Sequence, residues 1–218
     1  MRKLLTMIVA LSALPAAVQA ANLIQNGSFE ESTSAFTTPP GWFNIGHTEG
    51  VLSYATLGLP AFDGDYVYVT GGASSNGFLS VGEGIGQTVS TTAGDIYQLS
   101  FGYTGENCPG CSTVFTLNLG AFTQDFTITA DDSGYFRKAF TVATVDPYIA
   151  TGGSTTLSFV LKSSTNYGNN DPIFDQVVLE RIGAINPGAA PEPATWATMI
   201  LGLGASGAML RRRRRVAA

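Results

Sequence analysis

The chain has 218 residues, of which 44% are hydrophobic and 12% charged, and a formal net charge of −5. Residues 21–190 contain four Lys or Arg against fifteen Asp or Glu, which leaves about −11 on that part of the chain. A surface this acidic repels nucleic acid and anionic lipid. Nucleic-acid binding is therefore excluded, and cations or neutral partners are favoured.

The first 20 residues have the three parts of a secretory signal. A basic start at residues 2–3 precedes an apolar stretch over 4–14, and small residues at 16–20 offer a cleavage site. An uncleaved anchor or an ordinary N-terminal helix is the alternative, but the apolar stretch is too short to span a bilayer. We expect cleavage after Ala20 and export of the chain.

The region that follows, residues 21–183, is long enough for one domain with a single core. Short runs of β-formers alternate with Gly, Asn, Asp and Ser clusters, and no amphipathic stretch is long enough to predict a helix. Together these features predict an all-β fold, a jelly-roll-like antiparallel β-sandwich. The predicted strands are 23–30, 66–70, 85–89, 96–104, 112–119, 124–129, 136–144, 155–162 and 174–182.

Three segments of this region carry a family resemblance. They are residues 22–30 followed by Pro40-Gly41-Trp42, residues 62–69, and residues 174–180. They resemble the opening strand, an inner turn and strand, and the closing strand of galactose-binding-like jelly rolls, which include carbohydrate-binding modules. The resemblance implies glycan binding without catalysis.

The same resemblance implies a structural calcium between the opening and closing strands. Glu30 and Asp175 stand in the corresponding segments and are the predicted ligands. The residues alone are equally consistent with a solvated strand-end Glu30 and an Asp175 in a capped turn. We expect no other cofactor to be required.

Aromatic side chains among polar loop or strand-end residues are the candidates for stacking on sugar rings. Trp42, Tyr103 and Tyr167 are the three in such settings. The alternative is that these rings belong to the sandwich core, and Trp42 in particular suits a buried plug.

Cys108 and Cys111 are the two cysteines, and they stand between two predicted strands. In an oxidising compartment we expect them to form a disulfide that clamps the turn. A redox pair would need a helix N-terminus, and a zinc site would need further ligands.

Catalysis is not expected. His47 is the single histidine, which excludes a multi-histidine metal site, and no nucleophile-elbow pattern accompanies it. The carboxylate pairs Asp63/Asp65 and Asp131/Asp132 are the candidates for glycoside hydrolysis, but their settings are typical of turns.

The C-terminal end is a flexible linker, residues 184–190, and a tail, residues 191–218. The tail has three parts in a fixed order: Pro191, Glu192 and Pro193; an uncharged stretch over 194–210, predicted to be a single transmembrane helix; and a basic cluster of Arg211, Arg212, Arg213, Arg214 and Arg215. A buried core helix or a nucleic-acid-binding tail is the alternative.

This order of parts resembles the PEP-CTERM sorting signal of Gram-negative bacteria. The resemblance implies a transient membrane anchor, processing by an exosortase-type membrane protease, and transfer toward the cell surface and its exopolysaccharide. We therefore expect an exported cell-surface or matrix protein that binds glycan. The alternatives are a structural or adhesive matrix component with no sugar pocket and, third, a glycoside hydrolase.

Overall fold

The computed structural model describes residues 21–31, 37–46, 50–58, 62–70, 80–105, 112–129, 139–165 and 171–185. The predicted signal at 1–20 and the predicted tail at 191–218 lie outside these residues, as does its helix at 194–210. Within the described part of the chain, no helix has the length and apolar content needed to cross a bilayer.

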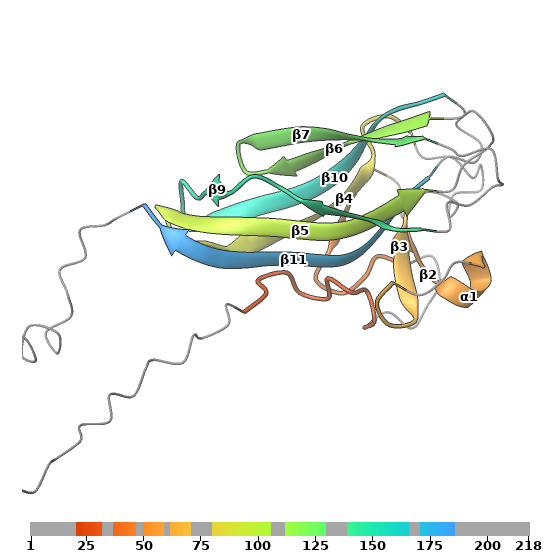
Figure 1. Ribbon diagram of the computed structural model, residues 1–218, viewed down its shortest axis with the longest axis horizontal. Coiled ribbons are helices and arrows are strands. Elements are labelled where there is room, and N and C mark those ends of the chain that lie inside the picture. Colours follow the sequence, from red (N-terminus) through yellow and green to blue (C-terminus); the bar gives the residue numbers. More distant parts are fainter. Residues whose placement is uncertain are drawn as a thin grey trace, which may run out of the picture.

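Eleven strands and one short helix make up the described fold (Figure 1). In chain order they are β1 (Phe43–Ile45), β2 (Gly50–Ser53), α1 (Tyr54–Leu57), β3 (Tyr66–Val69), β4 (Gly84–Ser90), β5 (Asp95–Gly105), β6 (Ser112–Leu119), β7 (Phe122–Thr129), β8 (Thr141–Thr144), β9 (Tyr148–Ile149), β10 (Ser154–Ser164) and β11 (Pro172–Ala184).

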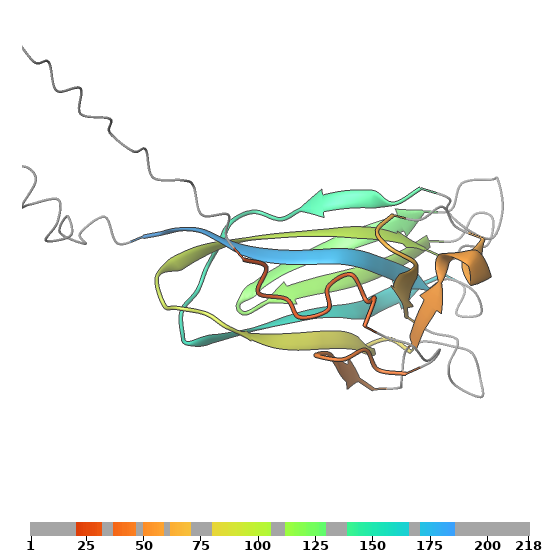
Figure 2. The same cartoon turned by 90° about the horizontal axis from the view of Figure 1, so that it is seen from below.

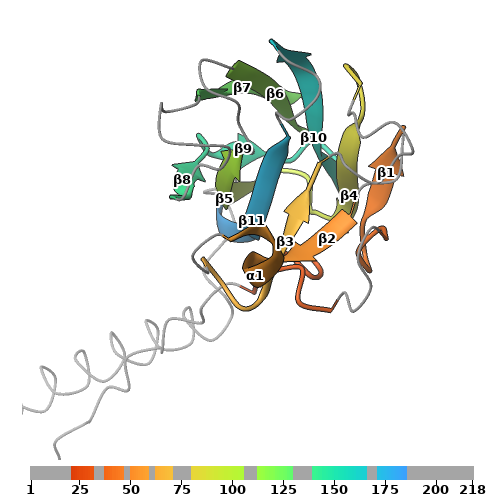
Figure 3. The ribbon, with the colours of Figure 1, turned by 90° about the vertical axis from the view of Figure 1, so that its right-hand side faces the viewer.

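The strands form two antiparallel sheets that face each other, as the end-on view in Figure 3 shows. The five-stranded sheet has the order β1-β4-β10-β6-β7. The six-stranded sheet has the order β2-β3-β11-β5-β8, with β9 also paired to β5. The predicted all-β antiparallel sandwich is therefore confirmed.

Strand predictions based on period-two alternation agree with the structure over most of the chain. The predicted strands at 85–89, 96–104, 112–119, 124–129, 155–162 and 174–182 fall on β4, β5, β6, β7, β10 and β11. Of the predicted strand at 136–144, the described part is a strand over Thr141–Thr144 only. The very short β1, β2 and β9 carry too few residues to show a period.

The predicted opening strand at 23–30 is wrong, because this segment folds as successive turns. Asn26 and Phe29 have φ values of 50° and 59°, in the left-handed region that breaks an extended strand. The segment still lies beside β11 (Figure 2), where the amide of Leu23 donates to the carbonyl of Leu179 at 2.9 Å. The amide of Val177 donates to the carbonyl of Gly27 at 2.9 Å.

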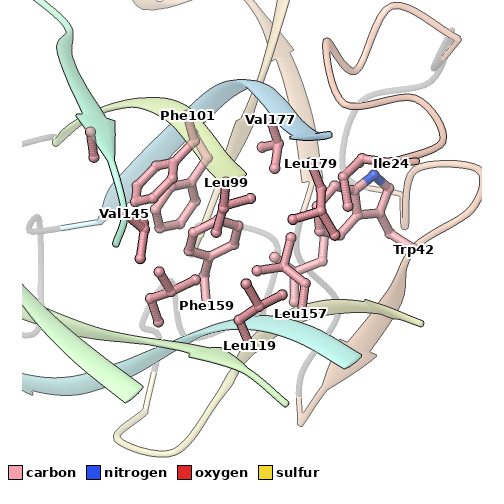
Figure 4. Close-up of a cluster of buried hydrophobic side chains, with 14 of the residues drawn as sticks. Ile24, Trp42, Leu99, Phe101, Leu119, Val145, Leu157, Phe159, Val177 and Leu179 are labelled. Carbon is pink, nitrogen blue, oxygen red and sulfur yellow. The ribbon is translucent and has the colours of Figure 1, made fainter. Parts of the chain in front are cut away.

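The main core lies between the two sheets and is filled by the inward-facing residues of the long strands. Leu99 and Phe101 on β5 face Leu157 and Phe159 on β10, as Figure 4 shows, and all four are at most 1% exposed. Burying aliphatic and aromatic side chains in this way stabilises the fold by roughly 1.5–3 kcal/mol per fully buried side chain.

A second apolar cluster covers part of the outer face of the six-stranded sheet. Tyr54 and Leu57 of α1 pack there against Val67 and Val69 of β3, with Phe62 beside them. The helix is short and capped at both ends. Consequently Val67, Tyr68 and Val69 of β3 are buried, on both faces of the strand.

Candidate functional site

The outer face of the five-stranded sheet has no described helix or strand packed over it. The strand register aligns one residue from each strand. In the order of the strands β1-β4-β10-β6-β7, the aligned residues are Phe43, Gly86, Ser158, Asn118 and Thr123. Residues directly opposite each other on neighbouring strands point to the same face of a sheet. These five residues therefore form one row across all five strands, which we call the central row.

The central row combines an aromatic ring with hydroxyl and amide groups. Phe43 is 41% exposed and lies over Gly86, where a Cβ atom would stand only 2.6 Å from Cζ of the ring. Nδ2 of Asn118 donates to Oγ of Ser158 at 3.2 Å, and Oγ1 of Thr123 donates to Oδ1 of Asn118 at 3.3 Å. The glycine thus provides the space for a ring that remains open to solvent.

A second row runs beside the central row on the same face. It consists of Ile45, Gly84, Val160, Thr116 and Asp125. Oγ1 of Thr116 donates to Oδ1 of Asp125 at 2.7 Å, and Nζ of Lys162 donates to Oδ2 of the same carboxylate. The hydrogen bond from Lys162, followed by that from Thr116, lowers the pKa of Asp125, so this carboxylate stays ionised.

Two of the three predicted sugar-stacking aromatics, Trp42 and Tyr103, are described, and both rings pack against core rings. Trp42 is only 7% exposed, its ring lies 5.4 Å from that of Phe29, and its Nε1 donates to the carbonyl of Asn26. The prediction for Trp42 is corrected: it is a buried plug between the opening segment and the core. Tyr103 is half-buried and packs against Phe101 and other core rings. Tyr167 lies outside the described residues.

The predicted calcium ligands meet on one turn, residues 63–66. Oε1 of Glu30 accepts from the amides of Asp65 at 2.9 Å and Tyr66 at 2.8 Å. Oδ2 of Asp175 accepts from the amide of Asp63 at 3.2 Å and from the hydroxyl of Tyr54. The turn at 63–66 therefore connects the opening segment to β11 through hydrogen bonds to the two carboxyl groups.

Asp175 is fully buried on β11. Its Oδ1 accepts from the amide of Gln176 at 2.6 Å. Burial raises the pKa of the Asp175 carboxyl to about 7, and burial together with the hydrogen bond to Asp175 raises the pKa of the Tyr54 hydroxyl. The carboxyl is thus held by donors from three different segments of the chain.

Calcium remains a prediction for this turn. The described residues contain no group of three or more acidic, histidine or cysteine side chains arranged to hold a metal ion. Because calcium takes six to eight oxygens, Glu30 and Asp175 fit it only with backbone carbonyls completing the shell. A polar pocket of about 390 Å³ opens beside the turn, lined among others by Asn26, Asp63 and Gln176.

Several other predicted residues lie outside the described part of the chain: Cys108, Cys111, His47, Asp131, Asp132, and the tail residues from Pro191 to Arg215. Sequence reasoning also missed Phe43 and the rest of the central row. A three-residue strand has no period to detect, and the row exists only through the pairing of five strands.

Comparison with known proteins gives two results of different kinds. Residues 189–215 match the PEP-CTERM protein-sorting motif, whereas no curated protein matches the sequence. Such a sorting signal implies export and membrane-associated processing before surface display.

Among solved structures, a xylan-binding domain from carbohydrate-binding-module family 22 has a TM-score of 0.50 and 13% identity, covering 76% of this chain and 98% of that one. A family 61 module in complex with β-1,4-galactotriose has a TM-score of 0.49 and 16% identity, covering 74% and 99%. The CBM22-1 xylan-binding domain from Paenibacillus barcinonensis Xyn10C has a TM-score of 0.48 and 18% identity, covering 78% and 99%.

At such identities, similarity to solved structures concerns the fold alone, and the family 22 domain with a TM-score of 0.50 supports it best. The chain therefore combines an all-β antiparallel sandwich, similar in fold to carbohydrate-binding modules, with a PEP-CTERM protein-sorting motif at residues 189–215.

Proposed function

We propose that this is an exported surface protein whose sandwich binds a neutral polysaccharide, without catalysis, on the outer face of the five-stranded sheet. The observation that carries the proposal is the central row: the exposed ring of Phe43 lies in line with the amide of Asn118 and the hydroxyl of Thr123, on a sheet face over which no described helix or strand packs, while Gly86 and Ser158 between them are buried.

The chemistry of the row suits sugar rings. The solvent-exposed side of Phe43 offers an apolar surface for the C–H face of a pyranose ring, while Asn118 and Thr123 offer donors and acceptors for hydroxyl groups. Five strands spaced about 4.8 Å apart give the row a length of roughly 19 Å. That length suits several units of a chain better than a single sugar.

Charge favours a neutral ligand over an anionic one. The exported part of the chain carries about −11, and the second row ends in the ionised Asp125. An acidic polysaccharide would meet repulsion over most of the surface, whereas a neutral one would not.

The two rows lack the arrangement that glycoside hydrolysis needs. Hydrolysis uses two carboxyl groups on either side of the bond, one of them with a raised pKa. Asp125 is the one carboxylate in the central and second rows, and its pKa is lowered by Lys162. Asp175, with its raised pKa, is fully buried on β11 in the other sheet.

A glycan-array screen of the signal-cleaved chain, followed by calorimetric titration of the best ligand, tests the proposal. Phe43→Ala and Asn118→Ala should each weaken binding about tenfold, which corresponds to roughly 1.4 kcal/mol. Val142→Ala is the matched control, because Val142 is 61% exposed but lies on β8 in the other sheet.

Two outcomes would contradict the proposal. Unchanged affinity in both Phe43→Ala and Asn118→Ala would remove the central row from binding. An array without any ligand would favour the alternative function, a structural or adhesive matrix component with no sugar pocket.

A further inference from the structure

Three of the six large apolar side chains that the described residues leave exposed are isoleucines near one end of the sandwich. Ile149 on β9 is 46% exposed, and Ile182 and Ile185 at the end of β11 are each 53% exposed. We call this group, with the half-buried Ile96 on β5, the isoleucine end. Single exposed apolar residues are ordinary on protein surfaces, but a group of them is typical of a contact surface.

Backbone pairing brings these residues together. Ile149 lies opposite Ile96, and Ile96 lies opposite Gly183, which directly follows Ile182. The amide of Ile185 donates to the carbonyl of Gly94 at 2.8 Å, at the start of β5. Figure 1 shows β9 and the ends of β5 and β11 together, at the opposite end of the molecule from α1.

The same end carries little charge. Its connecting segments, 91–94, 120–121 and 147–153, contain no charged residue. The acid Asp95 accepts a bidentate hydrogen bond from Arg181, and the neighbouring acids are the exposed Asp146 and the partly buried Glu180, which lies opposite Gln98 on β5. Of the eleven acidic residues that the structure describes, the other eight stand on other segments, which limits repulsion from an anionic surface at this end.

The tail leaves the sandwich at this end. Ile185 is the last described residue, and the match to the sorting motif begins at residue 189. The eight residues from 186 to the start of the predicted helix at 194 span at most about 29 Å when fully extended. A chain whose tail is in a membrane thus keeps the isoleucine end within reach of the lipid surface.

From these four observations we propose that the isoleucine end docks on the phospholipid surface of the membrane that holds the tail. The isoleucine side chains enter the headgroup and acyl boundary, as the apolar residues of peripheral proteins do. A weak contact is sufficient because the tail makes it intramolecular. Docking holds residues 186–193 close to the membrane, where a membrane protease can cut them. The inference does not depend on glycan binding.

Quenching by lipid provides the test. The full chain is reconstituted in phosphatidylcholine vesicles with and without brominated acyl chains, in a Trp196→Phe background that removes the indole of the tail. Ile149→Trp is compared with Val81→Trp. Val81 is 55% exposed but precedes the start of β4, away from the isoleucine end.

Docking predicts that brominated lipid quenches the indole fluorescence of the Ile149→Trp chain about twofold more than that of the Val81→Trp chain, the buried Trp42 being common to both. Adding Ile182→Ser and Ile185→Ser to the first chain should remove this excess, whereas adding Val142→Ser should not. Equal quenching in the two single variants would overturn the proposal. A different result would assign this end to contact between two copies of the chain. In that case brominated lipid would not quench the Ile149→Trp indole, and the indole would be shielded from iodide only at high protein density.

Discussion

The hydroxyl of Tyr54 on α1 donates a hydrogen bond to Oδ2 of Asp175 on β11, across 121 residues of sequence. This bond joins the short helix that packs against β3 to a fully buried carboxyl, and the amide of Asp63 donates to the same oxygen. One buried acid thus fixes α1, the turn at 63–66 and β11 relative to each other.

Tyr54→Phe should lower the free energy of unfolding by about 1–3 kcal/mol, because a buried carboxyl loses a hydrogen-bond donor while the ring packing stays. Urea unfolding followed by circular dichroism measures the change. Tyr66→Phe on β3 is the control and should alter the value by less than about 0.5 kcal/mol. Equal values for wild type and Tyr54→Phe would show that the bond contributes nothing to stability.

Calcium should raise the melting temperature of the signal-cleaved chain, in proportion to the logarithm of its concentration, if Glu30 and Asp175 hold the ion in the folded state alone. Melting with calcium and with a chelator measures the shift. Asp175→Ala should abolish it, and Asp125→Asn, a change to an exposed carboxylate on the other sheet, should leave it intact. Identical midpoints in calcium and in chelator would rule out the ion.

The mature protein should begin at Ala21, because the small residues before it form the best cleavage site after the apolar stretch. N-terminal sequencing of the exported protein gives a direct answer. An Ala20→Arg change should block cleavage at this position and leave a longer chain in the membrane fraction. Exported protein that still begins at Met1 would contradict the signal assignment.

Cys108 and Cys111 should be joined by a disulfide in the exported protein, since a short spacing in an oxidising compartment favours the bridge. Intact mass without reductant should be two hydrogens lower than with reductant. The loop is small, so reduction should cost only about 2 kcal/mol in the chain-entropy model. Free thiols on all molecules would refute the bridge.

Replacing Pro191, Glu192 and Pro193 with alanines should leave membrane insertion intact while a longer, membrane-bound form accumulates. The physical reason is that the apolar stretch 194–210 and the arginines after it are sufficient to halt translocation and hold the chain in a bilayer. Processing, in contrast, requires the Pro-Glu-Pro tripeptide. Immunoblots of membrane, surface and medium fractions separate the two steps. Wild-type size and amount at the surface would show that the tripeptide has no sorting role.

Sequence alone determined the strands whose own residues carry a period. In β6 and β10, alternate side chains enter the core. The alternation of apolar and polar residues that predicts each strand is therefore contained in about eight consecutive residues. The same holds for the sorting motif, whose parts stand in one continuous segment that needs no partner to be recognised.

Tertiary structure alone decided what depends on residues far apart in the chain. Trp42 is buried because its ring packs against Phe29 and its Nε1 donates to the carbonyl of Asn26. The opening segment folds as turns that hydrogen-bond to β11. The central row likewise exists only in the register of five strands, which brings Phe43 into line with Asn118. Such arrangements are determined by the pairing energies between strands that are distant in sequence. A local pattern of side chains therefore does not predict them.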